Sequence, residues 1–299
     1  MIVVFGSINV DLTATVERLP SAGETLHARS FSMSPGGKGA NQSLAARRAG
    51  ASVAMHGAVG RDPFGEPALA LLRTGDVDLA NVRPVVAPTG IALIHVDANG
   101  ENAITVIAAA NAQATAGQVS DDALGASTIV VMQLETPLAE VEALARRAHA
   151  SGARVILNGA PAAPLSADLL RHVHVLIVNE SEAQTIASAL CMATEANAFV
   201  AEYRGRFGAD AIVSLGSQGL VASSAAAPIA FAAPTVDVVD TVGAGDALVG
   251  ALAAALDRNA PWIRALKEGL AAGSLACTRA GAQPSLPYQR EIAALADTI

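Results

Sequence analysis

The chain has 299 residues, of which 52% are hydrophobic and 15% are charged, and its formal net charge is −8. Disordered chains are poor in apolar residues and rich in charge, so this composition predicts a folded globular protein. The acidic balance argues against a nucleic-acid partner, which needs a basic surface, but it allows a small anionic ligand bound by backbone dipoles.

The N-terminal residues Ile2–Phe5 read as a strand, and nothing before or after them resembles a signal peptide. No run of about 18 apolar residues is free of polar interruption, which argues against a membrane span. We therefore expect a cytoplasmic protein. The two cysteines, Cys191 and Cys277, lack the spacing of a zinc site or a disulfide framework, so we expect small core residues. We expect His172 and His174 to be a pair on one strand face.

Short β-branched runs alternate with Ala- and Leu-rich stretches along most of the chain. This alternation predicts βαβ units and a mostly parallel sheet covered by helices on both faces. The expected strands are Ile2–Phe5, Ser52–His56, Thr128–Met132, Arg154–Leu157, Val175–Val178 and Ala211–Ser214. The expected helices are Ala40–Ala49, Phe64–Arg73, Leu138–Ala150, Glu180–Ala189 and Glu195–Phe207. Ligands of such sheets bind at the carboxyl ends of the strands.

Two regions interrupt this alternation, at about 12–33 and 90–108. The first has short alternating strands, and the second has two apolar runs around the turn Asp97–Gly100, which predicts a hairpin. We expect both regions to form a small β-sheet lid over one edge of the main sheet. The alternative is that they are extra edge strands of that sheet. In either case residues 1–299 read as one domain.

A glycine-rich loop, Ser34–Gln42, precedes a predicted helix. It does not fit a dinucleotide-binding loop, because Gln42 stands where the third glycine is needed, and the chain has no P-loop pattern. Such a loop lets the backbone approach a ligand closely, and Asn41 offers donors and acceptors to sugar hydroxyls. The alternative is a tight turn in which Asn41 caps the helix. Upstream, Asp11 either accepts hydrogen bonds from a vicinal diol or is simply a turn residue.

A second glycine-rich turn, Asp240–Asp246, lies between a predicted strand, Thr235–Val239, and a predicted buried helix, Ala247–Leu256. The first amides of a helix lack intrahelical partners and, with the helix dipole, form an anion site. The amides expected to hold the charge of a transferring phosphoryl group are those of Gly243, Ala244 and Gly245.

Asp246 lies in the first turn of that helix. A carboxylate there can accept a proton from a substrate hydroxyl beside the anion site, which is the arrangement that a kinase needs. The alternative is that Asp246 only caps the helix and complements its dipole.

Taken together, these segments resemble the ribokinase-type (PfkB) carbohydrate kinase family over essentially the whole chain. The resemblance is carried by Gly6–Asp11, Gly36–Gln42, Thr89–Gly90, Gln133–Glu135, Asn179–Glu182, Asp240–Asp246 and Gly281–Ser285. It implies a three-layer sandwich with a central mostly parallel sheet and a small β-sheet lid. Two departures from the family pattern are Asn158–Pro161, where the family has Asn-Pro-Ala-Pro, and Ala247-Leu248, where it has Thr-Phe.

The resemblance also implies roles for individual residues. Asp246 would be the catalytic base, with Gly243, Ala244 and Gly245 as the anion hole. The sugar contacts would be Asp11, Gly37, Lys38, Asn41, Glu135 and Asp246. Asn179 and Glu182 would organise Mg²⁺ and phosphate, although their spacing also fits a capping box. The nucleotide would lie near Ser214, Gly216 and Gly219. A monovalent cation, usually K⁺, would be held by Asp240, Val242, Ala276, Arg279, Gly281 and Ser285.

The activity that the resemblance implies is phosphorylation of a primary hydroxyl of a small sugar by ATP, as in the conversion of D-ribose to ribose 5-phosphate. The alternatives are the same chemistry on fructose, on another ketose or acid sugar, or on a nucleoside. A nucleoside base needs an aromatic or apolar platform, and only 3% of the residues are aromatic. A sugar-binding regulator without catalysis is a further alternative, which predicts decay of the base or of the anion hole. The resemblance also implies a homodimer formed through the lid.

Overall fold

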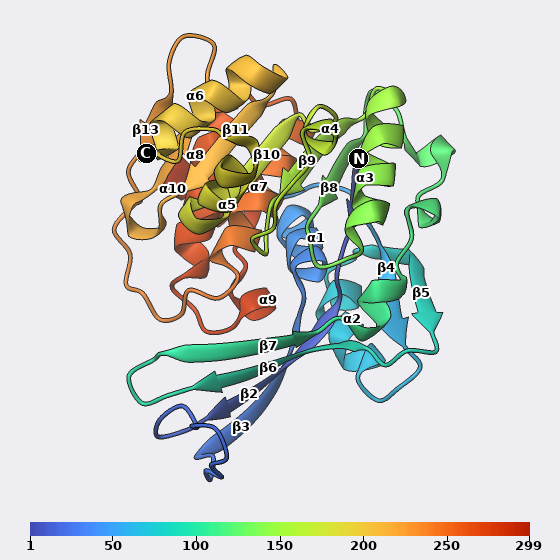
Figure 1. Cartoon of the computed structure of the whole chain (residues 1–299), viewed down its shortest axis with the longest axis vertical. Helices are drawn as coiled ribbons and strands as arrows, with labels where there is room; N and C mark the ends of the chain where they lie inside the picture. The colour runs from blue at the N-terminus through green and yellow to red at the C-terminus, as the bar shows by residue number, and fades with distance from the viewer.

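The computed structural model describes all residues, 1–299, and its centre is a nine-stranded sheet (Figure 1). The pairs are parallel except β11–β12 and β12–β13. In spatial order the strands are β13 (Ile229–Phe231), β12 (Leu220–Ala222), β11 (Asp210–Ser214), β10 (Val175–Asn179), β9 (Arg154–Asn158), β8 (Ile129–Met132), β1 (Ile2–Phe5), β4 (Val53–Gly60) and β5 (Asp78–Val85). The mostly parallel sheet is confirmed.

Helices cover both faces of this sheet, because alternate strand residues point to opposite sides. Ile2 and Val4 of β1 belong to one core cluster, and Val3 and Phe5 to the other. The first cluster includes α1 (Lys38–Arg48), α2 (Gly65–Thr74), α7 (Ala244–Asp257), α8 (Trp262–Ala276) and α10 (Gln289–Ala296). The second includes α3 (Leu138–Ala150), α4 (Ala167–Leu170), α5 (Glu180–Leu190) and α6 (Ala196–Phe207). The three-layer sandwich is therefore confirmed.

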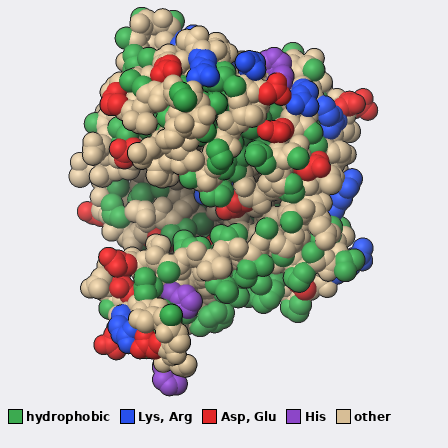
Figure 2. Space-filling model, viewed as in Figure 1, with side chains coloured by type: hydrophobic (Ala, Val, Ile, Leu, Met, Phe, Trp, Pro, Cys, Tyr) green, Lys and Arg blue, Asp and Glu red, His purple; other side chains and the backbone are tan.

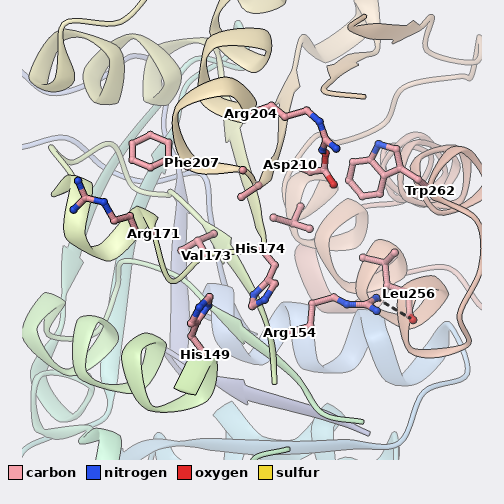
Figure 3. A pocket seen from close by; sticks show the side chains of 13 residues that line it. His149, Arg154, Arg171, Val173, His174, Arg204, Phe207, Asp210, Leu256 and Trp262 are labelled. Atoms are coloured by element: carbon pink, nitrogen blue, oxygen red, sulfur yellow. Dashed lines mark hydrogen bonds and ion pairs between the residues drawn. The ribbon is translucent and has the colours of Figure 1, made fainter. Parts of the chain in front are cut away.

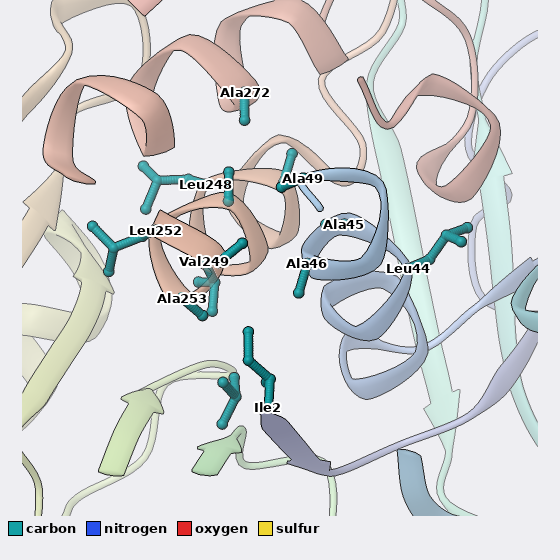
Figure 4. Packing of buried hydrophobic residues seen from close by; sticks show 14 of the residues in the cluster. Ile2, Leu44, Ala45, Ala46, Ala49, Leu248, Val249, Leu252, Ala253 and Ala272 are labelled. Carbon is teal, nitrogen blue, oxygen red and sulfur yellow. The ribbon is translucent and has the colours of Figure 1, made fainter. Parts of the chain in front are cut away.

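Small residues let α1 and α7 pack closely above β1 (Figure 4). A Cβ added at Gly250 of α7 would lie 2.5 Å from the Cβ of Ala45 and 2.7 Å from the backbone nitrogen of Ala46. A larger residue at this position would force the helices apart. The packing brings the first turns of α1 and α7, and hence the two glycine-rich motifs, to the same place.

Four strands form a separate small sheet below the main body (Figure 1). Their order is β3 (Ser30–Gly36), β2 (Asn9–Thr15), β6 (Gly90–Val96) and β7 (Asn102–Ile107). None of them pairs with the main sheet, so the alternative of extra edge strands is wrong. A short helix, α9 (Ala282–Ser285), lies above the small sheet in Figure 1.

The structure corrects several expectations from the sequence. Residues 235–239 form no strand; Thr235, Val236 and Val238 line a cavity instead. Cys191, which follows α5 in the left-handed conformation (φ 52°), is exposed, and Cys277 is half-buried, so neither is a fully buried core residue. His172 and His174 precede β10, and their rings lie against that of His149, edge-on for His172 and tilted for His174, so they are not a pair on a strand face. None of the helices is both long and apolar enough to cross a bilayer.

Candidate active site

Three adjoining cavities open around the two glycine-rich motifs. The largest lies between the small sheet and the main body, where Figure 2 shows the surface hollowed, and the other two lie within the main body. Their volumes are 630, 240 and 520 Å³. The largest and the smallest share Lys38, Gly243 and Asp246, and the smallest shares Ser214 and Gly245 with the third. The N-terminus of α7 therefore lies where the three meet, which leaves room for two ligands that touch at Asp246.

The 630 Å³ cavity, called here the sugar-side cavity, is lined by every residue predicted to contact the sugar. These residues are Asp11, Gly37, Lys38, Asn41, Glu135 and Asp246. They come from β2, the start of α1, the loop after β8 and the first turn of α7. The remaining wall includes the apolar side chains of Ala92, Ile94, Ile104 and Val106 on one face of the small sheet, none of which was predicted from the sequence to line the site.

Glu135 is held in place by two hydrogen bonds. Its Oε2 accepts one from Ser7 Oγ (2.5 Å) and one from the backbone nitrogen of Lys38 (3.1 Å). The same oxygen therefore joins the end of β1 to the start of α1. Because this oxygen is occupied, the other oxygen of Glu135 is the one available to a ligand.

Asp246 is almost fully buried, with 7% of its surface exposed. Its Oδ2 accepts a hydrogen bond from Asn41 Nδ2 (2.9 Å), and its Oδ1 accepts one from Gln42 Nε2 (2.8 Å). Neither Asn41 nor Asp246 caps its helix with its side chain, so the predicted caps are wrong, although Asp246 does lie in the first turn, where a carboxylate complements the helix dipole. Asn41 contacts Asp246 directly, and its Oδ1 is buried without a partner on the side chain that was expected to contact the sugar.

The first turn of α7 offers unpaired amides. No protein atom accepts a hydrogen bond from the N–H of Gly243, Gly245 or Asp246, whereas Ala244 donates a long bond to the carbonyl of Thr241 (3.3 Å). Gly243 begins the helix with φ 80°, and an added Cβ would lie 2.9 Å from Cα of Ala282. Glycine is therefore required at position 243 both by conformation and by space. Unpaired amides therefore lie where the anion site was predicted, although Ala244 is partly engaged, and anion binding there stays a prediction.

The charges around Asp246 are unbalanced. Burial raises the pKa of Asp246, and Lys38 and the amides of Asn41 and Gln42 oppose this rise. Burial, reinforced by Glu135 and Asp246, raises the pKa of Asp11 to about 6. Burial alone would lower the pKa of Lys38, but the fields of Asp246, Glu135 and Glu182 outweigh it and raise that pKa. One ammonium thus faces four carboxylates, which leaves an excess of negative charge.

The 520 Å³ cavity is lined by Ser214, Gly216 and Gly219, which were predicted to bind the nucleotide, and is called here the nucleotide-side cavity. Another wall consists of Leu270, Cys277 and residues of the segment 233–238, part of which was predicted to be a strand. The Asn179–Glu182 pair does form a capping box, with Asn179 Oδ1 accepting from the nitrogen of Glu182 (2.8 Å) and Glu182 Oε2 from that of Asn179 (2.8 Å). Both residues also line the 240 Å³ cavity.

Three of the residues predicted to hold a monovalent cation, Asp240, Val242 and Gly281, are linked by hydrogen bonds. Asp240 Oδ1 accepts from the nitrogen of Val242 (3.0 Å), and Oδ2 accepts from that of Gly281 (2.8 Å). Arg279 directs its guanidinium to Glu291, so its contribution to a cation would come from its carbonyl. No group of three or more His, Cys, Asp or Glu side chains is arranged as a metal site. The cation site itself stays a prediction.

Another cavity, of 420 Å³, lies at the amino ends of β9, β10 and β11, opposite to the carboxyl ends that face the predicted site (Figure 3). Arg154, His174 and Trp262 line it, and Arg204 pairs there with Asp210. None of the residues predicted to act in the reaction lies in this cavity.

Known proteins resemble this chain over nearly its full length. The family that matches, over residues 1–289, is described as pfkB family carbohydrate kinase. The ribokinase of Schizosaccharomyces pombe is 35% identical, with 97% of this chain and 96% of that protein covered. The ribokinase of Haemophilus influenzae is 33% identical, with 96% and 95% covered.

Solved structures agree with these relatives. A ribokinase of Thermotoga maritima matches with a TM-score of 0.91 and 28% identity, and 99% of each chain is covered. A ribokinase of Arabidopsis thaliana, complexed with ribose and ATP, matches with a TM-score of 0.88 and 30% identity, covering 99% of this chain and 98% of that one. The predicted ribokinase-like fold is confirmed.

Proposed function

The chain belongs to the pfkB family of carbohydrate kinases, and from this premise we propose that it transfers the γ-phosphoryl group of ATP to the primary hydroxyl of D-ribose. The single observation that carries the proposal is the meeting of a buried carboxylate, Asp246, with the unpaired amides of its own helix where the cavities join. The ribokinase names of the relatives support ribose as the acceptor.

In this reaction the sugar lies in the sugar-side cavity with its reacting hydroxyl at Asp246. One carboxylate oxygen of Asp246 accepts the hydroxyl proton while the hydroxyl oxygen attacks the γ-phosphorus and the bond to the ADP oxygen breaks. The N–H groups of Gly243 and Gly245 hold the negative charge on the transferring phosphoryl oxygens. Asp11 and Glu135 accept hydrogen bonds from the other sugar hydroxyls, since ionised carboxylates can only accept.

A divalent cation fits the charge of the site. The four carboxylates outnumber the one ammonium of Lys38, and the polyphosphate of ATP adds further negative charge. Bound Mg²⁺ would neutralise charge on the phosphates. Glu182, which is buried and lines the 240 Å³ cavity beside Asn179, would hold its water ligands. We also propose that K⁺ binds near Asp240, held largely by backbone carbonyls. The support is that the Asp240 carboxylate accepts hydrogen bonds from Val242 and from Gly281, and so holds together the two segments predicted to supply those carbonyls.

The small sheet supports a homodimer. Its face away from the cavity exposes large apolar side chains. Phe31 is 67% exposed, Met33 48%, Leu93 38% and Ile107 43%. A patch of this kind on a sheet marks an interface, and a second copy of the chain would cover it.

The cytoplasmic location remains a prediction.

The experiment that tests the function is ADP release over a panel of ribose, fructose and nucleosides, with Mg²⁺, and with or without K⁺. We expect ribose to have the highest kcat/KM. A higher value for fructose or for a nucleoside would replace ribose by that acceptor. If no compound in the panel causes ADP release, the alternative of a sugar-binding regulator without catalysis is favoured.

A further inference from the structure

Behind Asp246 lies a chain of three buried amide side chains to which no role has been assigned: Gln42 of α1, Gln133 after β8 and Asn158 at the end of β9. Gln42 Nε2 donates to Asp246 Oδ1 (2.8 Å) and to Asn158 Oδ1 (3.0 Å). Gln133 Nε2 donates to Gln42 Oε1 (2.7 Å). Gln42 and Gln133 are fully buried.

The orientation of every amide follows from the two ends of the chain. The carbonyl of Ile177 can only accept, so Asn158 must turn Nδ2 to it (3.1 Å) and Oδ1 to Gln42. The carboxylate of Asp246 can also only accept, so Gln42 must present Nε2 to it. Both ends therefore demand the same orientation of Gln42. Its Oε1 must then accept from Gln133, which fixes that amide as well.

The packing keeps Gln133 in this orientation at a cost. Its Oε1 is buried without a partner. A Cβ added at Gly6 would lie 1.9 Å from that oxygen, so the amide fits only because position 6 is glycine. An unpaired buried acceptor is unfavourable. The fold tolerates it in Gln133, whose Nε2 donates to Gln42, the residue that donates to Asp246.

We infer that Gln42 is a positioning residue for phosphoryl transfer, held by Gln133 and Asn158, which fixes the rotation of the Asp246 carboxylate and favours its ionised form. The inference rests on the proposed function of Asp246 as the base. Asn41 holds Oδ2 from the cavity side, and Gln42 holds Oδ1 from the core. With both oxygens held, the carboxylate meets the incoming hydroxyl in one orientation, and no reorientation is needed during the reaction.

The other charges near Asp246 act on it together with this amide. They are Lys38 of α1, Glu135 after β8, Glu182 of α5 and Asp11 of β2. A donor to the ionised form lowers a carboxyl pKa. Removal of the Gln42 amide therefore moves the acidic limb of the kcat profile to higher pH, because Asp246 becomes protonated more readily.

The test compares the variants Gln42→Met, Gln133→Met and the double variant with the unaltered protein. For Gln42→Met we expect kcat to fall by about 10-fold to 100-fold, the range for a hydrogen bond to a charged group. We expect the midpoint of the acidic limb of the kcat–pH profile to move up by about one pH unit. The dissociation constant of ribose, measured by calorimetry, should be nearly unchanged. Gln133→Met leaves both donors to Asp246 in place and should show a smaller change in the same direction. The double variant should have the kcat of Gln42→Met alone.

A matched control is Gln118→Met. Gln118 is another buried amide, which donates to the carbonyls of Gly57 (2.8 Å) and Asn81 (3.0 Å), away from Asp246. We expect it to lose stability with no change in the pH profile. If Gln42→Met also loses only stability, with kcat and the acidic limb unchanged, the positioning role is wrong. If the unaltered protein phosphorylates no sugar, it is instead the proposed function that fails.

Discussion

Replacing Asp246 by asparagine removes the proposed base while nearly preserving its shape. Loss of a general base typically lowers kcat by about 10²–10⁴-fold, which corresponds to about 2.7–5.5 kcal/mol in the barrier. The structure adds a second effect, because both carboxylate oxygens accept hydrogen bonds from amides. Asparagine has only one oxygen, so its NH₂ group would face either Asn41 or Gln42. An unmatched buried donor costs about 1–3 kcal/mol, and we expect lower thermal stability as well.

A double variant separates the two effects. In Asn41→Asp/Asp246→Asn, the new asparagine at position 246 can donate to the new aspartate at 41 and still accept from Gln42. We expect thermal stability to recover and turnover to stay low, because the carboxylate has moved away from the first turn of α7. The assay is ADP release at saturating ribose and ATP, with ribose binding measured by calorimetry. Retention of more than about a tenth of the original kcat by Asp246→Asn, or recovery of turnover in the double variant, would refute the base assignment.

Four other predictions follow from the same geometry. A Cβ at Gly245 meets no protein atom within 4 Å, but it would project where the 240 and 520 Å³ cavities meet; Gly245→Ala should therefore raise the melting temperature by about 1–3 °C while raising the KM for ATP, and a lower melting temperature with unchanged KM would contradict this. Because the pKa of Asp11 is raised from 3.8 to about 6, the KM for ribose should increase as pH falls through 6. The contribution of Asp11 to folding stability should improve in the same window, since the folded state binds the proton more tightly than the unfolded state. The variant Asp11→Asn should lack this rise in KM at acidic pH, and a rise that persists in the variant would assign it to another group. Chelation of Mg²⁺ should abolish ADP release, and added Mg²⁺ should restore it; activity that survives chelation would contradict the charge argument. Phe31→Asp should give a monomer by light scattering, and a dimer that persists would place the interface elsewhere.

Local patterns along the chain predicted much of the fold. The β-branched runs at Val175–Val178 and Ala211–Ser214 and the helix at Leu138–Ala150 lie where they were expected. These elements depend on periodicity and on length, which are visible in any short window. The strands β5 and β12 were missed, since exposed polar positions in the former and the three-residue length of the latter give no such signal. The segment 235–239 was misread because no strand pairs with it, and Thr235, Val236 and Val238 line a cavity instead.

The sequence by itself determined the chemical groups: two glycine-rich turns, a carboxylate in the first turn of a helix, and further carboxylates and one lysine near other strand ends. These are properties of residue type and spacing, which one stretch of chain carries without the rest. Only the tertiary structure decided that Asn41 and Asp246, 205 residues apart, share a hydrogen bond, and that Gln42 and Gln133 stand behind them. Such contacts depend on how closely α1 and α7 pack against each other on the sheet. The small residues at their interface permit this close packing, but they bring the distant side chains together only in the folded structure.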